Sequence, residues 1–148
     1  MSDASHLRRR TYAAYLMMGG FALTNVALGS LLNQIIAEFD LHSAEQGLMN
    51  SLQSVGSLFA IVSFPLMQGR IRKRWIFALS GVVQAASMLL CGFSLRYLML
   101  LVGSTLLGMG GAYTDSCANA YMADLHGHQS GSYISIMHGC FSLGAILS

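Results

Sequence analysis

An acid and an amide, Asp115 and Asn119, lie inside a long apolar stretch of this sequence. Their spacing of four residues puts them on one face of an α-helix, one turn apart. An ionisable side chain is costly inside a membrane, where it commonly marks a proton relay or a substrate pathway. If this stretch spans a membrane, Asp115 is therefore a candidate for binding and releasing a proton.

Polar side chains also recur at helical spacing in three other apolar stretches. Together with Asn119, the candidates for lining a substrate cavity are Asn25, Asn33, Asn50, Gln53 and His138. Each of these groups, taken alone, could simply hydrogen-bond to a neighbouring helix. Polar stripes on four helices are explained more simply by one shared, water-filled cavity, because polar groups in lipid need partners or water.

The composition supports a membrane location for these residues. Apolar residues make up 54% of the chain and charged residues only 9%, whereas soluble domains contain about 25% charged residues. The three cysteines have neither an even count nor Cys-x-x-Cys spacing, so a disulfide framework and a metal site are not expected. We expect the lipid bilayer as a partner, and neither a cofactor nor nucleic acid.

Five apolar segments of membrane-spanning length divide the chain. We place these spans at about 11–39, 46–68, 75–93, 97–123 and 131–148. The connections between them are short, so neighbouring helices should be antiparallel. The expected fold is an all-α membrane protein, with five transmembrane helices in one domain over residues 1–148.

Lysine and arginine are distributed asymmetrically between the two ends of these segments. Seven of the eight lie at Arg8–Arg10 or within Arg70–Arg74, and only Arg96 falls on the other side. Cytoplasmic connections carry the excess of positive charge, which puts the N-terminus and the 69–74 and 124–130 connections in the cytoplasm. We expect a multi-pass protein of the plasma membrane, which in a bacterium is the inner membrane.

Small residues run along the fourth segment beside the polar pair. They recur every four residues, at Ser104, Gly108, Ala112, Ser116 and Ala120. Such a series lets two helix backbones approach closely, and we interpret it as a packing ridge that determines where Asp115 points. No lysine or arginine lies within a predicted span. An ion-pair partner for Asp115 is therefore not expected there, which favours a functional role over a structural one.

The last residue, Ser148, directly follows the apolar run of the fifth segment, with no hydrophilic tail. Five spans would also leave this end outside the cell. We therefore expect the chain to be a fragment of a longer protein.

Three motifs resemble the N-terminal half of a major facilitator superfamily transporter. The first is the connection Gly69–Arg74, where that family has the signature Gly-x-x-x-Asp-Arg/Lys-x-Gly-Arg/Lys-Arg/Lys. The matching residues are Arg70, Lys73 and Arg74. Pro65 and Arg72 stand where the signature has glycine, and Gly69 replaces its aspartate. Any gating role of that aspartate therefore does not carry over.

The other two motifs lie in the fourth and fifth segments. One is similar to the glycine-rich fourth helix of the fucose-permease-like branch, and it reads Gly108-x-Gly110-x(4)-Asp115-x(3)-Asn119. The other is similar to a fifth-helix run in that branch, and it reads His138-Gly139-Cys140-Phe141-Ser142-Leu143-Gly144-Ala145. The resemblance covers nearly the whole chain, in order.

The resemblance implies a protein of twelve helices in two halves built from inverted repeats. Five of those helices would be present here, and the sixth helix and the whole C-terminal half would be missing. The implied function is secondary active transport of a small polar solute, sugar-like or another metabolite, by proton-coupled symport. Asp115 would carry the coupling proton, and the asparagines and His138 would contact the solute.

Two alternatives stay open. One is an efflux antiporter for drugs or metabolites, although such antiporters have a Gly-Pro pair in the fifth helix and this chain has no proline there. The other is a truncated, non-transporting membrane subunit that dimerises through the Ser104–Ala120 ridge. An enzyme is not expected, because Ser142 and His138 lack the Gly-x-Ser-Gly turn of an intramembrane serine protease.

Overall fold

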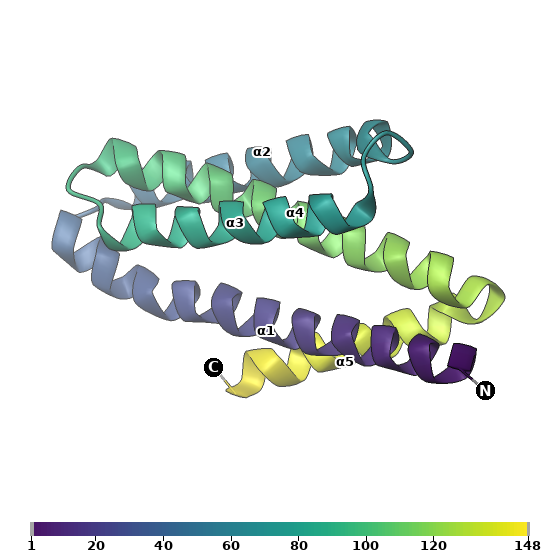
Figure 1. The fold of residues 1–148 in the computed structure, drawn as a ribbon. Helices are drawn as coiled ribbons and strands as arrows, with labels where there is room; N and C mark the ends of the chain where they lie inside the picture. The colour runs from purple at the N-terminus through teal and green to yellow at the C-terminus, as the bar shows by residue number, and fades with distance from the viewer. Residues whose placement is uncertain (1, 148) are drawn as a thin grey trace. The chain divides into compact units, whose positions relative to one another are not determined.

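The computed structural model describes the backbone of residues 2–147 and the side chains of residues 5–23, 25–26 and 34–147. The described chain is built of helices joined by short connections (Figure 1). They are α1 (Ser2–Phe39), α2 (Ser43–Met67), α3 (Lys73–Gly92), α4 (Tyr97–His126), the short 3-10 helix η1 (Gly127–Gln129) and α5 (Ser130–Leu147). The prediction of an all-α fold is confirmed.

Several of these helices are long and apolar enough to cross a membrane. Within the described residues, three segments qualify by length and composition: Ser43–Met67, Lys73–Gly92 and Tyr97–Leu147. The last of these contains α4, η1 and α5. The division of the chain into five separate spans stays a prediction.

Local hydrogen bonds and one glycine define the two ends of α2. Before α2, the backbone N–H of His42 donates to the Glu45 carboxylate at 2.9 Å, which closes a capping box. After α2, Gly69 takes a positive φ of 83°, a conformation that favours glycine. In the same turn the Arg70 N–H donates to the Met67 carbonyl at 3.2 Å. The residue that replaces the family's aspartate is therefore a turn glycine.

The chain forms two compact units. The first comprises residues up to Ser30 and from Ala118 onward, and the second comprises residues 31–117. α1 and α4 each contribute to both units.

In the second unit, α4 contacts α2 through glycines on both helices. A Cβ atom on Gly108 would collide with the backbone carbonyl of Gln53, and a Cβ on Gly56 would collide with that of Thr105. The Ser57 hydroxyl also donates to the Gly108 carbonyl at 3.0 Å. The two backbones approach this closely because glycine has no side chain, as in other membrane helix pairs.

A second row of small residues on α4 contacts α3. A Cβ on Gly103 would lie 2.6 Å from the Cys91 sulfur, and one on Gly110 would lie 2.9 Å from the Gln84 side chain. The Thr114 hydroxyl donates to the Ser80 hydroxyl at 2.9 Å, and both residues are buried. α4 is therefore held in the second unit by contacts on two of its faces.

In the first unit, α5 contacts α1 at another glycine. Gly144 is buried, and a Cβ there would lie 2.5 Å from the Gly19 carbonyl and 3.0 Å from the Ala22 side chain. Next to this contact, the rings of Phe21 and Phe141 lie 5.6 Å apart. Small residues thus set the helix separation here, while aromatic rings fill the space beside them.

Candidate functional site

Asp115 lies on α4, where it is half-buried and interacts with another group of the protein. Its neighbour Thr114 is buried against Ser80 of α3, and Gly111, one turn earlier, is also buried. The contacts of α4 with α2 and α3 determine how α4 is rotated within the second unit. The direction of the Asp115 side chain therefore follows from packing.

The structure brings two of the candidate cavity residues together in the first unit. Asn119 of α4 and His138 of α5 meet through the Asn119 Oδ1 and the His138 Nε2, at 3.2 Å. Because an amide oxygen only accepts, this hydrogen bond needs the histidine proton on Nε2. Asn119 is half-buried, and His138 is exposed. The pair thus offers an imidazole and an amide on an accessible surface.

The two candidates on α1 differ in what the structure describes. Asn25 is half-buried, and its Nδ2 donates to the Phe21 carbonyl of the same helix at 3.1 Å. The side chain of Asn33 lies outside the described residues. The Asn25 amide therefore already has one partner within α1.

The two candidates on α2 have different surroundings. Asn50 is exposed, and its backbone carbonyl accepts a hydrogen bond from Ser54 at 3.0 Å. Gln53 is half-buried and lies directly against Gly108 of α4. Gln53 thus takes part in helix packing, whereas Asn50 remains accessible.

The basic connection between α2 and α3 is open to solvent. Arg70, Arg72 and Arg74 are exposed, and Lys73 is half-buried. The Arg74 guanidinium lies 5.5 Å from the centre of the Trp75 ring, within the range of a cation–π contact. The Lys73 carbonyl accepts a weak hydrogen bond from the Cys117 thiol at 3.5 Å. Exposed cations here fit the expected role in membrane orientation.

The packing ridge on α4 is packed most closely at Gly108, against the backbone of α2. Ser104 and Gly108 are buried, whereas Ala112, Ser116 and Ala120 are half-buried. The sequence interpretation missed the row that contacts α3, which consists of Gly103, Gly110, Thr114 and Cys117. These residues are spaced by seven, four and three positions, which puts them on one helix face. This spacing could have identified the row from the sequence.

His126, expected in a cytoplasmic connection, is the last residue of α4. Its ring stacks on that of Tyr133 of α5, with centroids 3.5 Å apart and an interplanar angle of 8°. Its Nε2 lies 2.9 Å from the Thr11 hydroxyl of α1. Nothing local in the sequence indicates this cluster, because Thr11 and His126 are far apart along the chain.

A family model described as the Major Facilitator Superfamily matches residues 13–148. Comparisons with curated proteins and with solved structures found no significant match. The chain therefore belongs to the Major Facilitator Superfamily, whose members move small solutes across membranes. It is an integral, multi-pass membrane protein, and the predicted superfamily is confirmed. The fucose-permease-like branch and the expected truncation stay predictions.

Proposed function

We propose that this chain supplies the proton-coupling residue and part of the solute-binding surface of a symporter for a small polar solute. Membership in a family of solute transporters supports the general class. The observation that carries the finer proposal is Asp115, a half-buried acid on an apolar helix with tight contacts to its neighbours. Acids in such positions commonly act as proton relays.

The Asn119–His138 pair supports a polar solute. An amide and an imidazole together offer both donors and acceptors, which is what hydroxyl-rich solutes require. The imidazole is exposed, and the two groups are joined by the 3.2 Å contact that orders them. Asn119 follows Asp115 by one turn of α4, so this amide lies close to the acid along the helix.

Proton coupling follows from the energetics of an acid in a membrane. A charged carboxylate is costly there, so loading Asp115 with a proton lowers the cost of moving the binding site through a closed, dry state. Transport would then proceed by rocking of one half of the transporter against the other around the site. Asn25, Asn33 and Asn50 are further candidates for contact with the solute, on α1 and α2.

The test records external pH when neutral monosaccharides are added to cells that produce the protein, washed and suspended in weak buffer. We expect sugar-dependent alkalinisation, because each solute would carry a proton inward. Asp115→Asn should abolish both alkalinisation and accumulation, since the amide cannot carry the proton.

Asp124→Asn is the matched control, because Asp124 is an exposed acid near the end of the same helix and should leave transport intact. Full-rate accumulation against a gradient by Asp115→Asn would show that Asp115 is not the coupling group. Loss of ethidium from preloaded cells, with no sugar uptake, would favour the antiporter alternative instead.

A further inference from the structure

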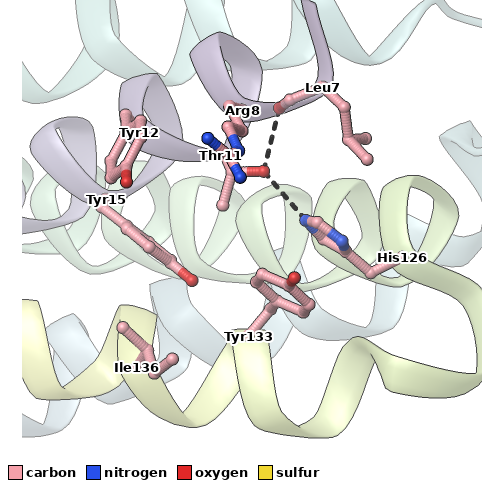
Figure 2. Close-up of a pocket in the computed structure, with 8 residues that line it drawn as sticks. All are labelled: Leu7, Arg8, Thr11, Tyr12, Tyr15, His126, Tyr133 and Ile136. Atoms are coloured by element: carbon pink, nitrogen blue, oxygen red, sulfur yellow. Dashed lines mark hydrogen bonds between the residues drawn. The ribbon is translucent and has the colours of Figure 1, made fainter. Parts of the chain in front are cut away.

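The first unit contains a cavity that the transport proposal does not use. Its volume is about 510 Å³, within the range of about 300–1,000 Å³ typical of small-molecule sites. Figure 2 shows that its walls come from the N-terminal part of α1, the end of α4 and the start of α5. Arg8, Thr11 and Tyr15 line it from α1, and their spacing of three and four residues puts them on one helix face.

One wall of the cavity holds an unpaired polar group. The Tyr15 hydroxyl is buried and has no hydrogen-bond partner among the described residues. In Figure 2 the Tyr15 ring extends from α1 toward Tyr133 and Ile136. A buried hydroxyl without a partner is costly, and an occupant of the cavity that hydrogen-bonds to it would remove that cost.

The charge of the lining residues selects an anion. Arg8 is the permanently charged side chain among them, and none of the lining residues is acidic. A guanidinium binds phosphate and carboxylate oxygens through paired, charge-assisted hydrogen bonds. An oxyanion would therefore meet one cation and several hydroxyl groups, without any opposing carboxylate in the wall.

The histidine in the wall is already hydrogen-bonded to Thr11. The Thr11 hydroxyl donates to the Leu7 carbonyl at 3.0 Å, so at the His126 contact of 2.9 Å it acts as the acceptor. The proton must then lie on Nε2, so His126 donates to Thr11. The stacked Tyr133 ring fixes the plane of this imidazole.

Apolar walls complete the cavity. Leu7 and Ile136 line it together with the rings of Tyr12 and Tyr133. An occupant with only a bare anion would leave these surfaces in contact with water. The lining therefore suits an oxyanion that is attached to an organic body.

We propose that this cavity binds a phosphate group carried on an organic body, held by Arg8 and the hydroxyl of Tyr15. The charge distribution predicts that the N-terminus lies on the cytoplasmic side, where anionic lipid head groups are concentrated. The phosphate could come from such a lipid or from a soluble phosphate ester of the cytoplasm. The site does not depend on the proton-coupled transport proposed above.

The test measures binding to the whole chain, purified in a neutral detergent, by native mass spectrometry. Dioleoylphosphatidylglycerol and dioleoylphosphatidylcholine form the lipid arm, and glycerol 3-phosphate and inorganic phosphate form the soluble arm. We expect the wild type to prefer phosphatidylglycerol if the source is lipid, or to bind glycerol 3-phosphate if the source is soluble. Arg8→Gln should weaken that binding about tenfold to a hundredfold, the effect of losing a charge-assisted hydrogen bond.

Two further variants separate a built site from general surface charge. Arg10→Gln removes the same charge from an exposed residue of α1 that does not line the cavity, and it should bind like the wild type. Tyr15→Phe keeps the ring and should weaken binding severalfold, while circular dichroism shows unchanged helix content. The proposal is overturned if Arg10→Gln loses as much affinity as Arg8→Gln. It is also overturned if neither arm shows saturable binding, which would leave a cavity filled by water alone.

Discussion

At the scale of single residues, the hydroxyl groups of this chain differ in whether they have partners. The Tyr97 hydroxyl donates to the Glu45 carbonyl at 2.8 Å, and Thr114 donates to Ser80. The Tyr15 hydroxyl has no partner among the described residues. A satisfied hydroxyl contributes to stability, whereas an unsatisfied buried one lowers it. Removal of the hydroxyl should therefore lower stability at Tyr97 but not at Tyr15.

We expect Tyr15→Phe to leave the free energy of unfolding unchanged or to raise it by about 1 kcal/mol in lipid-free detergent, because an unpaired group is removed. Tyr97→Phe should lower it by about 1 kcal/mol, since the Glu45 carbonyl loses its donor. Unfolding by sodium dodecyl sulfate, followed by circular dichroism, measures both. A clear loss of stability in Tyr15→Phe would mean that its hydroxyl is already satisfied within the protein.

At the scale of helices, glycine positions decide how closely α4 approaches its neighbours. Gly108 lies against the backbone of α2, whereas Gly103 and Gly110 lie against side chains of α3. A collision with backbone cannot be relieved by rotating a side chain, so it moves the whole helix. The α2 contact is therefore the less tolerant of the two.

We expect Gly108→Ala to lower the free energy of unfolding by about 1–3 kcal/mol, the usual cost of overpacking a tight contact. Gly81→Ala on α3 is the control, because a Cβ there would meet nothing within 4 Å. It should be neutral or mildly stabilising. The same unfolding assay compares the two variants, and equal stability would contradict the close approach of α2 and α4.

At the scale of the whole molecule, the distribution of charge predicts how the protein is oriented in the membrane. The exposed arginines after α2 and those at Arg8–Arg10 share the predicted cytoplasmic side. The connection between α1 and α2 carries no lysine or arginine and is predicted outside. Two exposed positions at opposite ends of α2, Ser43 and Gln68, can therefore report the orientation.

We expect a cysteine at Ser43→Cys to react with a membrane-impermeant maleimide in intact cells, in a background that lacks the native cysteines. A cysteine at Gln68→Cys should react only after the cells are permeabilised, because the basic connection is predicted to face the cytoplasm. Labelling of the two positions from the same side would overturn both the orientation and the span at α2.

The fold class and the family were accessible from the sequence because their signals are local. Apolar segments, their spacing and the basic connection at Gly69–Arg74 each lie within a short stretch of chain. The small residues on α4 were also visible, and Gly108 makes the kind of close contact that their spacing predicts. The role of Asp115 as a proton site stays a prediction that rests on its residue type and its half-buried position.

The partners of particular side chains were decided only by the tertiary structure. The sequence placed Asn119 and His138 on separate polar stripes, and packing of α4 with α5 brings them to 3.2 Å. The sequence put Gln53 and Asn50 in one group of cavity candidates. Packing half-buries Gln53 against Gly108 and leaves Asn50 exposed. The cavity beside Tyr15 had no sequence signal, because its walls come from both ends of the chain. Helical periodicity specifies which residues share a face, whereas the helix that covers that face depends on close packing between distant segments.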